Sequence, residues 1–120
     1  MKTRTLVKDD TVLVPQVEVA TRWWQRMRGL LGRHGLAAGH AMYLAPAPSI
    51  HTLFMRFAID LVFVTRGLRV VRIVRGVRPF RIASGGLKAH GVFELEAGWL
   101  AENAVVVGDR LAWSAVREGQ

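Results

Sequence analysis

The chain has 120 residues, of which 51% are hydrophobic and 22% are charged, and it contains no cysteine. This size and composition predict one packed domain and exclude a disordered protein, disulfide bonds, thiolate metal sites and a thiol nucleophile. The net charge of +8 can attract nucleic acid or anionic lipid, but an arginine-rich coding bias would produce the same excess without any such partner.

The beginning of the chain predicts two strands, residues 3–8 and 11–20, joined by a turn at Asp9 and Asp10. Pro15 interrupts the second strand, so we expect an edge strand or a bulge there. This segment has no apolar region of signal-peptide length, and no later apolar run reaches about 18 residues. We therefore expect a cytoplasmic protein with no transmembrane segment.

Residues 21–31 predict a short amphipathic helix, which Thr21 can cap. Its apolar residues recur with helical spacing at Trp23, Trp24, Met27, Leu30 and Leu31. Gly32 is placed to end the helix. Elsewhere we expect no helix beyond a single turn near residues 98–102.

The densest apolar stretch is residues 50–63, which read IHTLFMRFAIDLVF. From residue 57 onward, alternation places one set of side chains on one face of a strand: Phe57, Ile59, Leu61 and Phe63. Asp60 falls on the opposite face, between small apolar side chains. Because burying an unpaired charge is costly, Asp60 needs a wet cavity or a partner. The candidate partners are His51, Thr52, Arg56 and an arginine from elsewhere in the chain.

Arginine then recurs at every third residue, at positions 66, 69, 72, 75, 78 and 81. Arg66 and Gly67 predict a hairpin turn between residues 59–65 and 68–74. A period of three fits neither a strand nor a helix, so these side chains cannot all share one face of a regular element. A bulge near Arg75 and Gly76 would reconcile the pattern with a strand.

The last part of the chain predicts a loop at residues 83–89 and short strands at 91–96, 105–107 and 111–116. Many short strands separated by turns are typical of a sandwich or barrel. We therefore predict one mainly all-β domain over residues 1–120. Its architecture would be a β-sandwich or barrel-like antiparallel sheet with one short amphipathic helix near residues 21–31.

The motif IHT-x-x-M-R-F-x-I-D-x-x-F resembles the central signature of the prokaryotic "domain of unknown function 192" family. The flanking motifs agree as well: Arg28-Gly29-Leu30, Leu95-Glu96, Gly98 and Gly108-Asp109. The resemblance runs from about Val17 to Leu111, which is most of the chain. The resemblance implies a compact β-rich fold and relatives that are often exported. It implies no reaction, since the family has no established activity.

Five polar residues at positions that match the family's motifs form the predicted ligand site: Arg28, His51, Thr52, Asp60 and Glu96. A carboxylate, an imidazole and a guanidinium beside aromatic walls would suit a small polar or anionic ligand, with the arginine as a bidentate clamp. The alternative is structural: Asp60 and Arg28 would form a buried pair that ties the helix to the sheet.

The leading functional hypothesis is therefore a small β-rich binding module with a polar pocket. One alternative is a basic surface for nucleic acid or an anionic membrane, formed by Arg69, Arg72, Arg75, Arg78 and Arg81. Sequence-specific nucleic-acid binding is disfavoured, because no RNA-recognition or helix-turn-helix pattern is present. The other alternative is a hydrolase that uses Asp60 and Glu96 as acid and base.

Other chemistry has weaker support in the sequence. The four histidines show no paired ligand spacing, and no nucleophile elbow precedes a serine, so we assign no catalytic residue, metal or cofactor. Ser84, Gly85 and Gly86 beside Lys88 could cradle an anion with backbone N–H groups, although such short glycine pairs are common in plain turns. The oligomeric state is not readable from the sequence.

Overall fold

The computed structural model describes residues 2–22, 25–26, 35–51 and 56–115. Over these residues the strands are β1 (Lys2–Lys8), β2 (Thr11–Ala20), β3 (His40–Leu44), β4 (Ser49–His51), β5 (Ile59–Val64), β6 (Val70–Val77), β7 (Ile82–Ser84), β8 (Gly91–Glu96) and β9 (Ala112–Trp113). A single-turn helix, α2 (Trp99–Glu102), follows β8. No helix in the described part of the chain is long and apolar enough to cross a membrane.

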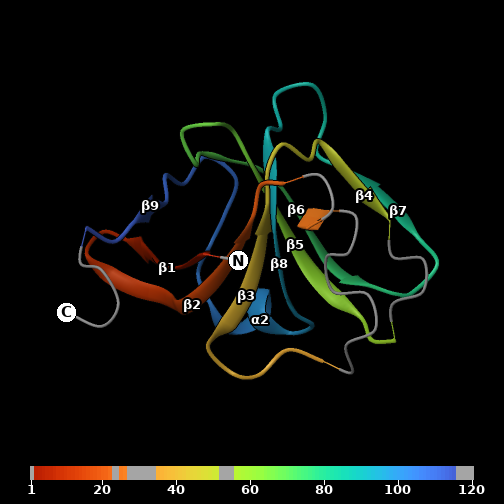
Figure 1. Cartoon of the computed structure of the whole chain (residues 1–120), viewed down its shortest axis with the longest axis horizontal. Helices are drawn as coiled ribbons and strands as arrows, with labels where there is room; N and C mark the ends of the chain where they lie inside the picture. The colour runs from red at the N-terminus through yellow and green to blue at the C-terminus, as the bar shows by residue number, and fades with distance from the viewer. Residues whose placement is uncertain (1, 23–24, 27–34, 52–55, 116–120) are drawn as a thin grey trace.

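Seven strands form one curled sheet in the order β6-β5-β8-β3-β2-β1-β9, and β4 pairs with β7 in a separate two-stranded sheet (Figure 1). The curled sheet forms a half-barrel, which confirms the prediction of a mainly β, barrel-like fold. The sheet is mixed rather than wholly antiparallel, because β2 and β3 run parallel. The sequence between β2 and β3, residues 21–39, is long enough for the crossover that a parallel pair requires.

The first hairpin confirms the predicted strands and turn. Asp9 and Asp10 both have positive φ, at 49° and 64°, which matches the twist of a two-residue hairpin turn. The pairing of β1 with β2 shifts between Arg4 and Leu6, so the strand containing Pro15 is bulged. It is not an edge strand, since β2 lies between β1 and β3.

Most of the helix predicted at residues 21–31 lies outside the described residues. Gln25 and Arg26 are helical, and the amide of Arg26 donates to the carbonyl of Arg22 at 3.0 Å. The Gln25 side chain accepts hydrogen bonds from the amides of Thr21 and Arg22, which satisfies donors at the start of the turn. The single turn expected near residues 98–102 is present as α2.

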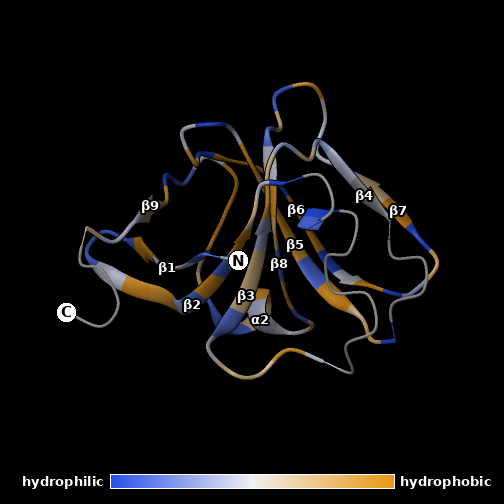
Figure 2. Ribbon diagram, viewed as in Figure 1, coloured by the Kyte–Doolittle hydropathy of each residue, from blue (hydrophilic) through white to orange (hydrophobic). Residues whose placement is uncertain are grey.

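The sheet separates two apolar cores, and β5 contributes to both because all six of its residues are buried. Ile59, Leu61 and Phe63 join one cluster, which we call the β7-side core because Ala83 of β7 packs against it. Val62 and Val64 join the other, the α2-side core, which contains Leu100. This division confirms the predicted alternation, and Figure 2 shows the apolar residues of β5 in orange.

Three expectations near the C-terminus need correction. Residues 105–107 are not a strand: Val105 is buried in the α2-side core, while Val106 and Val107 are exposed at a turn. The strand expected at 111–116 shortens to β9, which pairs with β1 at two positions. The region predicted as a loop at 83–89 begins inside β7, because residues 82–84 pair with β4.

Candidate anion-binding site

Asp60, the centre of the predicted ligand site, is buried with 1% of its surface exposed. Its Oδ1 accepts a hydrogen bond from the backbone N–H of Gly76 at 2.8 Å, and its Oδ2 accepts one from Leu100 at 2.8 Å. The buried charge is therefore compensated, as burial requires. Among the described residues its hydrogen-bond partners are main-chain amides, not the histidine, threonine or arginine side chains that the sequence suggested.

These two hydrogen bonds tie a bulge to a helix. Gly98 at the start of α2 has φ +95° and supplies no side-chain cap, so Asp60 provides the acceptor for the first turn from a different element. On the other side, the β5–β6 pairing passes from Leu61↔Val74 to Ile59↔Val77, which adds one residue to β6. Gly76 lies in this bulge with φ +60°, and Asp60 holds its amide.

Glu96, the second predicted carboxylate, lies on the other side of the sheet from Asp60. In the β5–β8 ladder Asp60 stands opposite Leu95, whereas Glu96 stands opposite Ile59. Because paired residues share a face and successive residues alternate, the two carboxylates project in opposite directions. They do not flank a common space, so the structure gives no support to the acid–base pair considered for a hydrolase.

The other three predicted site residues are not placed in the same detail. Arg28 and Thr52 lie outside the described residues, and His51 is described only by its main chain, which pairs with Ile82 in the β4–β7 ladder. A buried carboxylate that the sequence analysis did not single out, Glu94, stands opposite Met42 and Leu61 with 4% of its surface exposed. No group of three or more His, Asp or Glu residues in the described regions could hold a metal ion.

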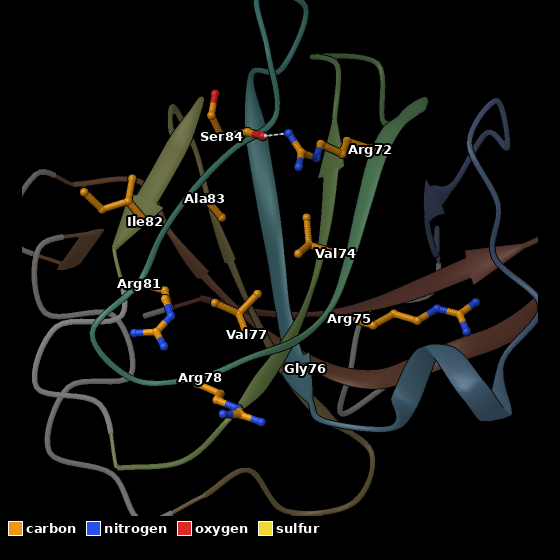
Figure 3. Close-up of a pocket in the computed structure, with 10 residues that line it drawn as sticks. All are labelled: Arg72, Val74, Arg75, Gly76, Val77, Arg78, Arg81, Ile82, Ala83 and Ser84. Carbon is orange, nitrogen blue, oxygen red and sulfur yellow. Dashed lines mark hydrogen bonds between the residues drawn. The ribbon is translucent and has the colours of Figure 1, made fainter.

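A polar cavity lies instead between β6 and β7, beside the segment that connects them (Figure 3). It has a volume of about 580 Å³. Ten residues line it: Arg72, Val74, Arg75, Gly76, Val77, Arg78, Arg81, Ile82, Ala83 and Ser84. Four of them are arginines, and none of these lining residues is acidic. We call this cavity the arginine groove.

The bulge at Gly76 determines which residues of β6 face the arginine groove, because it adds one residue within the arginine repeat. Arg72, Val74 and Val77 pair with Phe63, Leu61 and Ile59, so all three share the face of β6 that points to the β7-side core. Without the extra residue, Val77 would fall on the opposite face. The predicted bulge near Arg75 and Gly76 is thus confirmed, and a second register shift lies between the pairs of Phe63 and Val64.

The four arginines occupy different parts of the groove. Nη1 of Arg72 donates to the carbonyl of Ser84 at 2.9 Å and so bridges β6 and β7. Figure 3 shows Arg78 and Arg81 toward the opposite end, while Arg75 extends away from β7. The guanidinium of Arg81 donates to the carbonyl of Phe80 at 3.3 Å. Each guanidinium carries five N–H donors in a planar fork, the geometry that matches a carboxylate or a phosphate.

The glycine-rich loop after β7 does not form the anion cradle that was considered. The amide of Gly85 donates to the carbonyl of Pro48 at 2.9 Å, and the amide of Gly86 donates to Oγ of Ser84 at 3.2 Å. Both N–H groups are therefore already used. Gly85 is needed for packing instead, since a Cβ there would lie 2.5 Å from the ring of Phe63.

Comparisons with known proteins agree on the fold and give no function. The profile of DUF192, described as "Uncharacterized ACR", matches residues 4–113. A protein of unknown function from Novosphingobium aromaticivorans has a crystal structure with a TM-score of 0.80 and 20% identity, covering 92% of this chain and 84% of that one. A Sinorhizobium meliloti protein named "putative transcription regulator" has a TM-score of 0.81 and 25% identity, covering 94% of both chains. No curated protein matches. With its motifs in order and nearly its whole length matched, the chain belongs to the DUF192 family.

Proposed function

We propose that the protein is a small β-rich binding module and that the arginine groove holds its anionic ligand. The observation that carries this proposal is the composition of the groove: its lining has no acid and four arginines around about 580 Å³ of open space, although the side chain of one of them, Arg75, extends away from β7. Arginine remains charged at physiological pH and binds carboxylate and phosphate through two parallel hydrogen bonds. The apolar floor of Val74 and Val77 lowers the local dielectric, which strengthens such bonds.

Asp60 takes a positioning role in this proposal. Its bond to the amide of Gly76 fixes the bulge, and the bulge sets which face of β6 carries Val77 and the arginines around it. The carboxylate itself is buried and bonded, so it does not contact the ligand. Arg28, His51, Thr52 and Glu96 stay predicted ligand residues from the sequence, and their single alanine variants belong in the same binding assay.

A thermal-unfolding titration with pyrophosphate and citrate, at about 0.15 M salt, tests the proposal. Both anions should raise the unfolding midpoint of the wild-type chain, and the double variant Arg78→Ala, Arg81→Ala should lose most of that rise. The matched control is Arg4→Ala, Arg110→Ala, which removes the same charge from positions outside the groove. No stabilisation of the wild type, or equal losses in both double variants, would contradict the proposal.

The phosphate backbone of nucleic acid is a second candidate ligand for the same arginines. Two observations favour it: the arginine repeat along β6 and the segment that connects it to β7, and the name of the Sinorhizobium meliloti relative. Binding of a single-stranded oligonucleotide, followed by fluorescence anisotropy, should then weaken with salt at a log–log slope of about −0.7 per phosphate contacted. A flat salt dependence, or a slope that the Arg78→Ala, Arg81→Ala variant leaves unchanged, would exclude this ligand.

A further inference from the structure

The segment beside the arginine groove exposes large apolar side chains to water. Phe80 is 63% exposed, Ile82 is 81% exposed and Leu87 is fully exposed. Three of the six large apolar side chains exposed on the described surface thus fall within eight residues. Single exposed apolar residues are ordinary on protein surfaces, but three in one short segment that borders the arginine groove favour contact with an apolar partner.

The same segment is basic. Arg78 and Arg81 line the groove next to Phe80 and Ile82, and Lys88 follows Leu87 in the chain. Arg78 and Arg81 lie in the segment between β6 and β7, and Figure 3 shows the side chain of Ile82, at the start of β7, directed away from them. A surface with this combination matches a partner that is itself negatively charged outside and apolar beneath.

We propose, on the basis of the function proposed above, that the anion in the arginine groove is the phosphate of an acidic lipid and that residues 80–87 dock on the membrane surface. In this arrangement Phe80, Ile82 and Leu87 enter the boundary between headgroups and acyl chains, while the guanidinium groups stay at the level of the phosphates. Amphipathic surfaces bind membranes through this pairing of buried apolar area with attraction to anionic headgroups.

The chemistry of the exposed side chains favours lipid over nucleic acid. Proteins hold single-stranded nucleic acid by stacking bases on aromatic rings. Of the three exposed side chains, only Phe80 is aromatic, and aliphatic Ile82 and Leu87 offer no ring for stacking. Aliphatic side chains do partition into the lipid boundary, as the hydrophobic effect requires.

Vesicle sedimentation with the full chain tests this inference. The probes are vesicles of phosphatidylcholine alone and vesicles of phosphatidylcholine and phosphatidylglycerol at about 2:1, at about 0.15 M salt. The wild type should bind only the anionic vesicles. Phe80→Ser, Ile82→Ser should weaken the partition at least about tenfold, because two apolar side chains no longer insert. Arg78→Ala, Arg81→Ala should weaken it roughly 25-fold, at about fivefold per arginine.

Matched controls separate insertion from general hydrophobicity and charge. Val12→Ser, Val107→Ser changes two side chains that are 54% and 58% exposed at other places in the chain, and it should leave the partition unchanged. Arg4→Ala, Arg110→Ala should reduce it less than the groove variant. The serine variants should keep the wild-type unfolding midpoint, since the replaced side chains lie largely in water.

The soluble headgroup glycerophosphoglycerol distinguishes the two proposals. If it binds the groove as tightly as the vesicles do and Phe80→Ser, Ile82→Ser has no effect, the ligand is a free phosphate: the function proposed above holds and membrane docking is wrong. Equal binding to neutral vesicles, or tighter binding to an oligonucleotide than to anionic vesicles, also overturns the docking. If neither vesicles nor any soluble anion binds, both proposals fail.

Discussion

Replacing Asp60 by asparagine tests whether this carboxylate is the tie between the Gly76 bulge and α2. The substitution keeps the size of the side chain and changes its hydrogen-bonding groups. Asparagine retains one oxygen to accept from one amide, but its NH2 group faces the other amide, donor against donor. Either Gly76 or Leu100 then has a buried N–H that lacks an acceptor.

The expected loss can be estimated from these two bonds. A hydrogen bond to a charged group contributes about 1.5–3 kcal/mol, and an unsatisfied buried donor costs about 1–3 kcal/mol more. We therefore expect Asp60→Asn to lower the free energy of unfolding by about 3–5 kcal/mol. That is a large part of the ~5–15 kcal/mol typical of a small domain. With a urea slope of about 2 kcal/mol per molar, the midpoint should fall by about 2 M.

Urea unfolding followed by tryptophan fluorescence measures this change, and Glu102→Gln is the control because that carboxylate is exposed in α2. Hydrogen exchange at the amides of Gly76 and Leu100 reports the local effect. Because both amides donate to Asp60, both should be protected in the wild type, and at least one should exchange faster than its neighbours in the variant. A loss below about 1 kcal/mol, or unchanged exchange at both amides, would refute the assignment of Asp60 as the tie.

Three further predictions concern two glycines and one half-buried carboxylate, Asp109. Gly91→Ala should destabilise by about 3 kcal/mol in urea unfolding, because its Cβ would lie 2.3 Å from Oη of Tyr43, a ring already packed on Phe93. Gly76→Ala should cost only about 1–2 kcal/mol, since its Cβ meets no atom within 4 Å and only the positive φ is strained; an equal loss in both variants would contradict the packing argument. The Lys8 side chain and the amide of Val106 hold the pKa of the Asp109 carboxyl below its ordinary value of 3.8. The ionised carboxylate therefore stabilises the fold fully above about pH 3.8, and this stabilisation is lost as the pH falls through the folded-state pKa. Asp109→Asn should thus lower the unfolding midpoint at neutral pH, and its midpoint should fall less than that of the wild type below about pH 4. If the midpoints of the wild type and the variant fall in parallel, the Lys8–Asp109 pair does not contribute to stability.

Much of the fold follows from local pattern. Alternation in residues 57–63 predicted which side chains of β5 enter each core, because a strand has a strict period of two. Asp9, Asp10, Arg66 and Gly67 predicted their turns for similarly local reasons. The bulge at Gly76 could be predicted because the arginine period conflicts with the strand period, and only an extra residue resolves the conflict.

The features that were missed depend on contacts between distant segments. The burial of Asp60 could be predicted, but its partners are main-chain amides, and an amide has no residue-specific signature in a sequence. The parallel pairing of β2 with β3 depends on a crossover whose path the sequence does not specify. β7 has three residues and little pattern of its own, so its pairing with β4, and with it one wall of the arginine groove, could not be predicted.

The central claim is that anions bind between β6 and β7, and an NMR titration of the full chain with pyrophosphate tests it most directly. We predict that the side-chain Nε–H signals of Arg78 and Arg81 shift together with the amides of residues 74–78 and 81–84, while the Nε–H signals of Arg4 and Arg110 stay in place. Saturating shifts that centre on Glu94 and Glu96 instead, or no saturable shift at about 0.15 M salt, would contradict the account.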